Sequence, residues 1–553
     1  MTGILDLPEE IRPFIGKFLD TKSIQACLLV SRSFHQSFEP ILWQKVVIRP
    51  SISDPGYDIN VHPVDVNALR TRTRNVHNYV IHDTVASEFY QLSFPHLRRL
   101  QLSDKGLEVS SRAAKNEDSA PLPLIYLRQA SDQTQLVRLN PTPRTLVVTS
   151  LPATPDAEFW ETIYSTWVSP RILHATGPVA STEKAANAFW RACTRFSELS
   201  LLSLTAVPSP ILSTLTFPRV RRLNLQTTSS AQPREVKPQD HLFLMKACPQ
   251  LKHLTWDAIP YSSTSTSSAS ALLSDFRQAI EQNHWPYLDS LEFSRLYNKL
   301  GKELVLLLQA FPNPLTALRL KTCAFNSRVL ALLKDKKFES LRILKIYANC
   351  GITSKATLDI LTSCPNIEVF RSTHIFASDI NPSKPWVCKR LRSLTVCFIH
   401  RESTPNRVAL DQQVYTQLAK LTDLTRLDLG QYSMGYTISD PEFHLKDAMN
   451  TLDLRLKAGL GQLSTLTKLR FFGYANSFQV TGQAELSWMM EHWKELRTLI
   501  GQLDGIERSA LRAMEARGVE YRLSGCKVSI QSVVFILNTP ELTSDTPQIL
   551  PVL

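Results

Sequence analysis

The feature that most constrains the fold is a short apolar phrase, L-x-x-L-x-L, that recurs along most of the 553-residue chain. Alternating apolar residues in its L-x-L part predict a short strand with one buried and one exposed face. The clearest copies are FPHLRRLQL (94–102), FSELSLLSL (196–204), FPRVRRLNL (217–225), CPQLKHLTW (248–256), WPYLDSLEF (285–293), PNPLTALRL (312–320), FESLRILKI (338–346), CPNIEVFRS (364–372), CKRLRSLTV (388–396), LTDLTRLDL (421–429) and LSTLTKLRF (463–471). Weaker copies are TPRTLVVTS (142–150) and SPRILHATG (169–177).

Helical patterns lie between the copies, in 241–248, 274–282, 303–311, 328–335 and 356–364. The first apolar anchors Leu315, Leu341, Ile367 and Leu391 follow one another at 26, 26 and 24 residues. Each strand–helix unit would expose an apolar flank that only a neighbouring unit can cover. The sequence therefore predicts an α/β solenoid of stacked units, with loop insertions where the spacing is longer.

The copy LRILKIYANCGITSKATLDILTSCPNI (341–367) resembles the cysteine-containing leucine-rich repeat. Cys350, Ile352, Thr353 and the pair Cys364-Pro365 stand at the matching places. The resemblance implies a curved parallel sheet on a concave face and helices on the convex face. We expect the cysteines to be small buried residues in the turns rather than metal or redox groups.

The first forty or so residues predict three short helices that are apolar along one side. In LDLPEEIRPFIGKFL (5–19), apolar residues recur at the helical spacing from Ile11 to Leu19. A second helix would carry Ile24 and Leu28, and a third would carry Phe34. A segment this short rarely forms a stable core alone, so its apolar side is expected to dock on another surface.

This segment resembles an F-box. The matching residues are Leu7-Pro8-Glu9-Glu10, IRPFIGKFL (11–19), LVSRSF (29–34) and Leu42-Trp43. Ser31 and Phe34 stand where the family commonly has Cys and Trp, and Pro13 falls early in the first helix. The resemblance implies adaptor-binding residues, which are Leu5, Leu7, Pro8, Ile11, Ile15, Phe18, Leu19, Ile24, Leu28, Val30, Phe34 and Trp43.

An F-box followed by leucine-rich repeats is similar in plan to the substrate receptors of SCF ubiquitin ligases. The resemblance implies that the F-box docks on the S-phase-kinase-associated adaptor, which links to a cullin and a RING subunit. The repeats would bind the target protein, and the chain itself would supply neither catalysis nor a cofactor. One alternative is a repeat scaffold that binds the adaptor without cullin, and another is a basic solenoid that binds RNA or an acidic surface.

Three adjacent strands predict where a target would bind. In each L-x-L strand, the residue between the buried positions and the residue after the strand are expected on the concave face. These residues are Arg319, Lys321, Lys345, Tyr347, Arg371 and Thr373. Clustered Arg and Lys favour an acidic or phosphorylated segment of the target through charge-assisted hydrogen bonds. The alternative is an ordinary solvated polar face.

Composition excludes several other classes of protein. The net charge is +12, from 62 basic and 50 acidic residues, but no block of five like charges occurs, which argues against a nucleic-acid-binding tail. Nine cysteines without a C-x-x-C pair argue against zinc sites and disulfide frameworks and favour a reducing, intracellular location in the cytoplasm or nucleus. No phosphate-binding, metalloprotease or hydrolase motif is present, so we expect no enzymatic activity.

The sequence predicts four regions. They are an F-box over 1–48, a linker and the start of the solenoid over 49–92, the solenoid over 93–535 and a tail over 536–553. Loop insertions are expected at 103–123, 227–239, 261–270, 401–413 and 431–444, where Ser, Pro and polar residues gather. The helical pattern in 506–523 is expected to cover the last apolar face of the solenoid.

Overall fold

The computed structural model describes most of the repeat region and part of the amino-terminal segment. The described residues are 24, 27–28, 30–42, 45–48, 66–76, 78–82, 91–103, 130–149, 154–206, 214–226, 238–257, 266–294, 301–321, 323, 325–336, 339–347, 352–401, 406–430, 450–475 and 479–522. The chain divides into two compact units, Met1–Leu288 and Asp289–Leu553. Each unit is described by itself.

The first unit contains one parallel sheet whose strands pair in chain order from β1 to β8. The strands are β1 (Lys45–Ile48), β2 (Asn78–His82), β3 (Arg99–Ser103), β4 (Thr145–Thr149), β5 (Ile172–Ala180), β6 (Glu198–Ala206), β7 (Arg222–Gln226) and β8 (His253–Asp257). The helices are α3 (Arg32–Leu42), α4 (Val66–Thr71), η2 (Thr73–Asn75), α6 (Ala130–Leu139), α7 (Ala157–Thr166), α8 (Glu183–Cys193), α9 (Pro238–Lys246) and α10 (Thr266–Glu281).

The second unit contains a parallel sheet in the order β9 to β15, then β17 and β19, with a separate pair β16–β18. The strands are β9 (Ser290–Ser294), β10 (Ala317–Lys321), β11 (Ile343–Tyr347), β12 (Val369–Phe376), β13 (Ser393–Ile399), β14 (Arg426–Asp428), β15 (Phe471–Gly473), β16 (Val480–Thr481), β17 (Thr498–Ile500), β18 (Gln502–Leu503) and β19 (Glu520–Arg522). The helices are α11 (Gly301–Ala310), α12 (Ser327–Lys336), α13 (Ser354–Ser363), η6 (Ala377–Asp379), α14 (Arg407–Leu418), η7 (Leu456–Ala458), η8 (Leu460–Thr465), α16 (Gln483–His492) and α17 (Arg508–Ala516).

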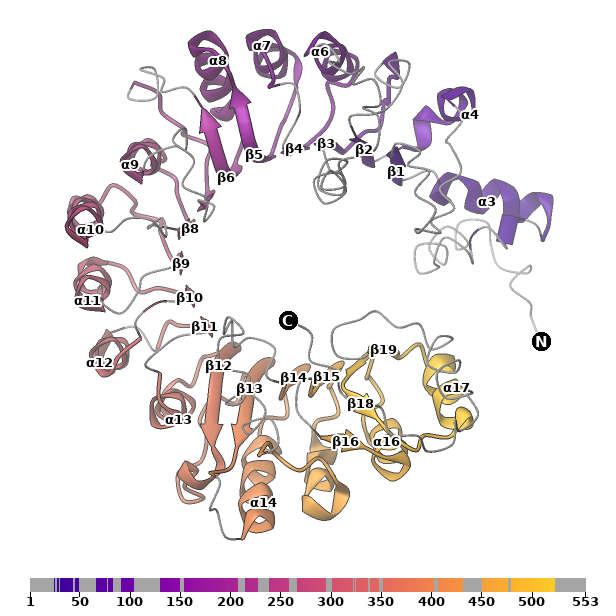
Figure 1. Cartoon of the computed structure of the whole chain (residues 1–553), viewed down its shortest axis with the longest axis vertical. Coiled ribbons are helices and arrows are strands. Elements are labelled where there is room, and N and C mark those ends of the chain that lie inside the picture. The colour runs from indigo at the N-terminus through magenta and orange to yellow at the C-terminus, as the bar shows by residue number, and fades with distance from the viewer. Residues whose placement is uncertain are drawn as a thin grey trace, which may run out of the picture. The chain divides into compact units, whose positions relative to one another are not determined.

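Both units have the architecture that the repeats predict, an α/β solenoid of the leucine-rich-repeat type. The helices follow the outer side of each curved sheet and the strands line the inner side (Figure 1). The anchors Leu315, Leu341 and Ile367 are completely buried between the sheet and the helices. Thr353 caps α13, because its Oγ1 accepts a hydrogen bond from Ala356 N at 3.1 Å. Both weaker copies are strands, β4 and β5.

Four predicted loops are partly wrong, two of them only at an edge, because Ser103 ends β3 and residues 238–239 begin α9. Residues 266–270 belong to α10, because Ser and Thr are well tolerated in the first turn of a helix even though they are poor in its interior. Residues 407–413 belong to α14, which buries Val414 and Leu418 one turn apart and so gains an apolar side. The rest of the predicted loops at 104–123, 227–237, 261–265, 402–405 and 431–444, and the tail 536–553, lie outside the described residues.

The repeats also extend further than the copies found in the sequence. Strand β17 was not predicted as a copy. The buried residues Trp493 and Leu496 precede it with the apolar spacing of the other copies. The segment 506–523 contains helix α17, as predicted, but also one more paired strand, β19. At the other end, β1 pairs with β2, so the sheet begins inside the range predicted for the F-box. Among the described residues, no helix has the length and hydropathy needed to cross a membrane.

Candidate functional site

The amino-terminal module packs around two phenylalanines of α3. Phe34 and Phe38 lie one turn apart with ring centroids 5.3 Å from each other, and together with Ile24 they form a small buried cluster. Ser31 precedes the helix and its Oγ accepts a hydrogen bond from Phe34 N at 3.2 Å, which is a helix cap. Outside this cluster, Glu39 of α3 accepts a hydrogen bond from Arg72 Nε at 2.5 Å.

The predicted adaptor-binding residues fall into three groups. Ile24 and Phe34 are buried in the module's own cluster, so their side chains pack inside the module. Leu28 packs at the edge of that cluster and is partly buried, whereas Val30 is 59% exposed. Among the predicted adaptor-binding residues that the structure describes, Val30 is therefore the most exposed. The other predicted residues lie outside the described residues; they are Leu5, Leu7, Pro8, Ile11, Ile15, Phe18, Leu19 and Trp43.

The second candidate site is a row of charged side chains across the sheet of the second unit. The parallel register aligns Arg319 of β10, Lys345 of β11 and Arg371 of β12. Each is partly buried and stands between fully buried neighbours, as the L-x-L pattern predicts. Lys321 and Tyr347 are also paired. Thr373 lies beyond the last registered pair of β11 and β12, in the segment where the register of β12 shifts.

The cations in this row influence one another. Burial lowers the pKa of Lys345, and the nearby guanidinium groups of Arg319 and Arg371 lower it further, while Glu292 opposes them. The Arg371 guanidinium lies 4.3 Å from the centre of the Tyr347 ring, a favourable cation–π distance. The Nε atom of Arg371 is buried and has no hydrogen-bond partner among the described residues. The row therefore keeps positive charge that a bound anion could use.

Charged residues of the strands on both sides of the row belong to the same surface. Arg319 lies 4.0 Å from Glu292 of β9, and its Nη1 donates to Ser290 Oγ at 3.3 Å. Arg426 of β14 is close enough to lower the pKa of Lys345, and it pairs with Asp428 at 3.1 Å. The copy LTDLTRLDL (421–429) already places Arg426 and Asp428 on a strand, so the repeat pattern was sufficient to include them in this surface. Four cations thus face two carboxylates, which leaves this surface positive.

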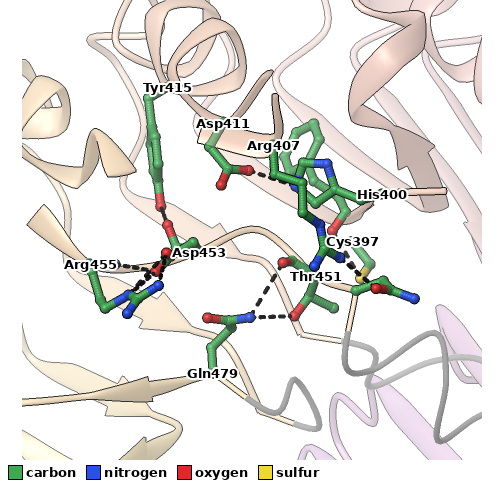
Figure 2. A network of polar contacts seen from close by, with 11 residues as sticks. Cys397, His400, Arg407, Asp411, Tyr415, Thr451, Asp453, Arg455 and Gln479 are labelled. Carbon is green, nitrogen blue, oxygen red and sulfur yellow. Dashed lines mark hydrogen bonds and ion pairs between the residues drawn. The ribbon is translucent and has the colours of Figure 1, made fainter. Parts of the chain in front are cut away.

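A polar network that the sequence did not suggest lies beyond the end of β13 (Figure 2). His400 Nε2 and Asp411 Oδ1 are 2.7 Å apart, and both side chains are almost fully buried. Tyr415 of α14 donates to the carbonyl oxygen of Asp453 at 2.5 Å, and Gln479 donates to Thr451 Oγ1 at 3.2 Å. The network joins α14 and the end of β13 to the segment 450–455.

A buried His–Asp pair is also the arrangement that orients a catalytic base, so its surroundings matter. The second ring nitrogen of His400, Nδ1, is buried without a hydrogen-bond partner among the described residues. Among the described residues no nucleophile is hydrogen-bonded to it, and the pair connects α14 to the end of β13. Burial raises the pKa of Asp411, which the hydrogen bond with His400 opposes.

Two buried cysteines of the second unit, Cys364 and Cys388, are poorly placed to react. Burial raises the pKa of Cys388 to about 12 and that of Cys364 even higher, so both thiols stay protonated at neutral pH. Cys364 is a buried residue of the turn, as the repeat pattern predicts, whereas Cys350 lies outside the described residues. Within the described ranges, no cluster of His, Cys, Asp and Glu could hold a metal ion.

Comparison with known proteins supports the reading of the amino-terminal segment. Residues 4–49 match the family model described as F-box-like. No curated protein matches the chain. A leucine-rich-repeat protein of Leptospira interrogans is 14% identical, with 83% of this chain and 98% of that chain covered and a TM-score of 0.33. In the Rad7 and Elc1 complex of yeast, the matching chain is 12% identical, with 73% and 96% covered and a TM-score of 0.35. Because both TM-scores are low, the fold assignment rests on this chain's own strand register.

Proposed function

We propose that this protein is the substrate receptor of an SCF-type cullin–RING ubiquitin ligase. The observation that carries the proposal is the F-box-like segment at 4–49, joined to a leucine-rich-repeat solenoid that offers a charged strand surface. The segment binds the S-phase-kinase-associated adaptor, the adaptor links the chain to cullin, and the repeats hold a target protein. In this role the chain works inside the cell, in the cytoplasm or the nucleus, and contributes specificity rather than catalysis.

The adaptor step is tested by changing an exposed apolar residue. Burying a large apolar side chain at an interface contributes about 1.5–3 kcal/mol, so Val30→Asp should weaken adaptor capture at least about 10-fold. Leu7→Ala combined with Pro8→Ala should do the same. The measurement is a quantitative pull-down of adaptor and cullin with the full chain from cells. Val408→Asp is the matched control, because Val408 is 53% exposed on α14 and lies outside the module.

Three results of this pull-down separate the hypotheses. Adaptor and cullin recovered together, and lost together in the Val30 variant, support the ligase receptor. Adaptor recovered without cullin supports the alternative scaffold. Equal adaptor capture by the wild type and both module variants would contradict the F-box assignment.

The target step is tested on the charged row of the second unit. Reversing Arg319→Glu and Arg371→Glu replaces two cations of the row by carboxylates, one of them beside Glu292, so an acidic or phosphorylated target should bind several-fold more weakly. The measurement is a mass-spectrometric comparison of proteins captured under proteasome inhibition by wild type and variant. Adaptor capture serves as the internal control and should not change. Retention of every captured target, at high salt as well, would show that the row is ordinary surface.

A further inference from the structure

Basic side chains line the edge of the first unit's sheet where the strands begin. The residues before successive strands are joined by backbone hydrogen bonds, from Arg171 N to Arg144 O at 2.8 Å and from Lys252 N to Arg221 O at 2.8 Å. Arg144 N bonds to Arg98 O in the same way, at 2.9 Å. We call the following exposed residues the basic edge: Arg98, Arg144, Arg171, Arg221, Arg222 and Lys252.

Few acidic groups neutralise the basic edge. Glu198 lies 3.4 Å from Arg171 and 3.6 Å from Arg222, so one carboxylate is shared by two guanidinium groups. The structure gives no ion pair to the other four members within the described residues. Because exposed charges in water are screened rather than cancelled, the edge keeps a strong positive potential at short range.

The second unit provides an internal comparison at the same structural position. There, Arg342 pairs with Glu368 at 3.5 Å, and Arg470 pairs with Glu495 at 2.9 Å. Lys468 likewise pairs with Asp423 at 2.6 Å. In both units a helix usually ends shortly before a strand begins, and the carboxyl end of a helix favours cations. Arg392 and Arg497, which also precede strands of the second unit, have no ion pair within the described residues. Each unit therefore pairs some of these cations with carboxylates and leaves others exposed without one.

The basic edge is hollowed rather than flat. One hollow of about 730 Å³ is lined by Arg171, Arg221, Arg222 and Lys252, with Glu198 among them. A second hollow of about 430 Å³ is lined by Arg98 and Arg144. Among the described residues that line the two hollows, none is Phe, Tyr or Trp. Proteins that bind single-stranded nucleic acid rely on such aromatic rings to stack the bases.

We propose that the basic edge binds an extended acidic segment of a partner protein. Five of its six members are arginines, whose planar guanidinium groups bind carboxylates with two parallel hydrogen bonds. Neighbouring strands are about 4.8 Å apart, and an extended peptide presents a side chain every 3.3 Å or so. Because successive side chains point to opposite faces, a run of Asp and Glu presents one carboxylate to the basic edge about every 6.6 Å, which is between one and two strand spacings. This surface is separate from both sites of the proposed function and does not depend on them.

The test measures binding of the full chain to a fluorescein-labelled peptide of about twenty glutamates, by fluorescence anisotropy at low and moderate salt. The double variant Arg144→Glu and Arg221→Glu should bind at least 5-fold more weakly, and wild-type binding should weaken as salt rises. Both residues are exposed, so the fold should be retained, which circular dichroism checks. Arg508→Glu with Arg512→Glu on α17 is the matched control, since it changes the net charge by the same amount at two exposed positions outside the basic edge.

The outcomes are distinct. Loss of peptide binding in the Arg144 and Arg221 variant alone supports the proposal. Equal loss in the control variant would mean that net charge, not the basic edge, binds the peptide. If a twenty-nucleotide single strand, a DNA duplex or phosphatidylserine vesicles bind more tightly than the peptide and depend on Arg144 and Arg221, the partner class is wrong. Unchanged peptide binding in both variants would overturn the proposal.

Discussion

At the scale of single residues, His241 shows how burial makes stability depend on pH. Its side chain lies on α9, is 6% exposed, and its Nδ1 atom has no hydrogen-bond partner among the described residues. Burial lowers the pKa of His241 from 6.5 to about 4. Between pH 6.5 and pH 4, His241 is therefore protonated in the unfolded state but still neutral in the folded state. The contribution of His241 to stability is therefore present above pH 6.5 and is lost as the pH falls toward 4.

We expect the urea midpoint of the wild type to fall between pH 7 and pH 4.5 more steeply than that of His241→Leu. One pKa unit corresponds to about 1.4 kcal/mol, so the difference between the two profiles should approach about 2–3 kcal/mol at the acidic end. His284→Gln is the control, because His284 is exposed, and it should keep the wild-type profile. Parallel pH profiles for wild type and His241→Leu would show that His241 does not contribute to the pH dependence of stability.

At the scale of elements, Gly501 connects β17 and β18 under a buried aromatic ring. A Cβ atom at this position would lie 2.1 Å from Cζ of Tyr474. The ring has little room to move, since the Tyr474 hydroxyl donates to Gln502 O at 2.9 Å and contacts Thr481 Oγ1. The close approach of ring and backbone therefore requires glycine here.

Gly501→Ala should lower the free energy of unfolding by about 1–3 kcal/mol or more, because overpacking forces the ring or the backbone to shift. A lower urea midpoint, together with loss of near-ultraviolet ellipticity, would be the sign. Gly461→Ala is the matched control, since the nearest atom to its new Cβ is Leu456 Cδ2 at 4.0 Å. If both alanine variants unfold at the wild-type midpoint, the contact at Gly501 is not as tight as described.

At the scale of the whole molecule, the boundary of the amino-terminal module determines how it can be removed. Strand β1 pairs with β2 from Lys45↔Asn78 to Ile48↔Ile81, so removing residues 1–48 would expose the edge of β2. An unpaired edge strand promotes association between chains. Removing residues 1–44 keeps β1 and takes away only the helical module.

We expect the chain without residues 1–44 to keep the wild-type melting temperature and to lose adaptor capture. The chain without residues 1–48 should melt lower or aggregate, which light scattering during heating would detect. Identical melting and scattering for the two truncations would contradict the role of β1. Whether residues 93–535 form one elongated body stays a prediction from the repeats, for which limited proteolysis provides the measurement.

The sequence by itself determined the repeat unit, because the alternation within L-x-L and the helical spacing between copies are local properties. Leu315, Leu341 and Ile367 are buried as their spacing predicts, and Arg319, Lys345 and Arg371 align because each occupies the same place in its copy. Where a local signal was weak, as before β17 or within α14, the packing against neighbouring units decided the structure.

Only the tertiary structure decided which charges meet. The basic edge draws on residues between Arg98 and Lys252, and the sequence shows no block of like charge there. The parallel register brings these residues together, because neighbouring strands lie a few ångströms apart whatever the length of chain between them. The register of β15 and β17 likewise places Tyr474 over Gly501, whereas the packing of α14 against the end of β13 places Asp411 against His400. Local periodicity therefore determined the elements, and long-range pairing determined the surfaces that partners can bind.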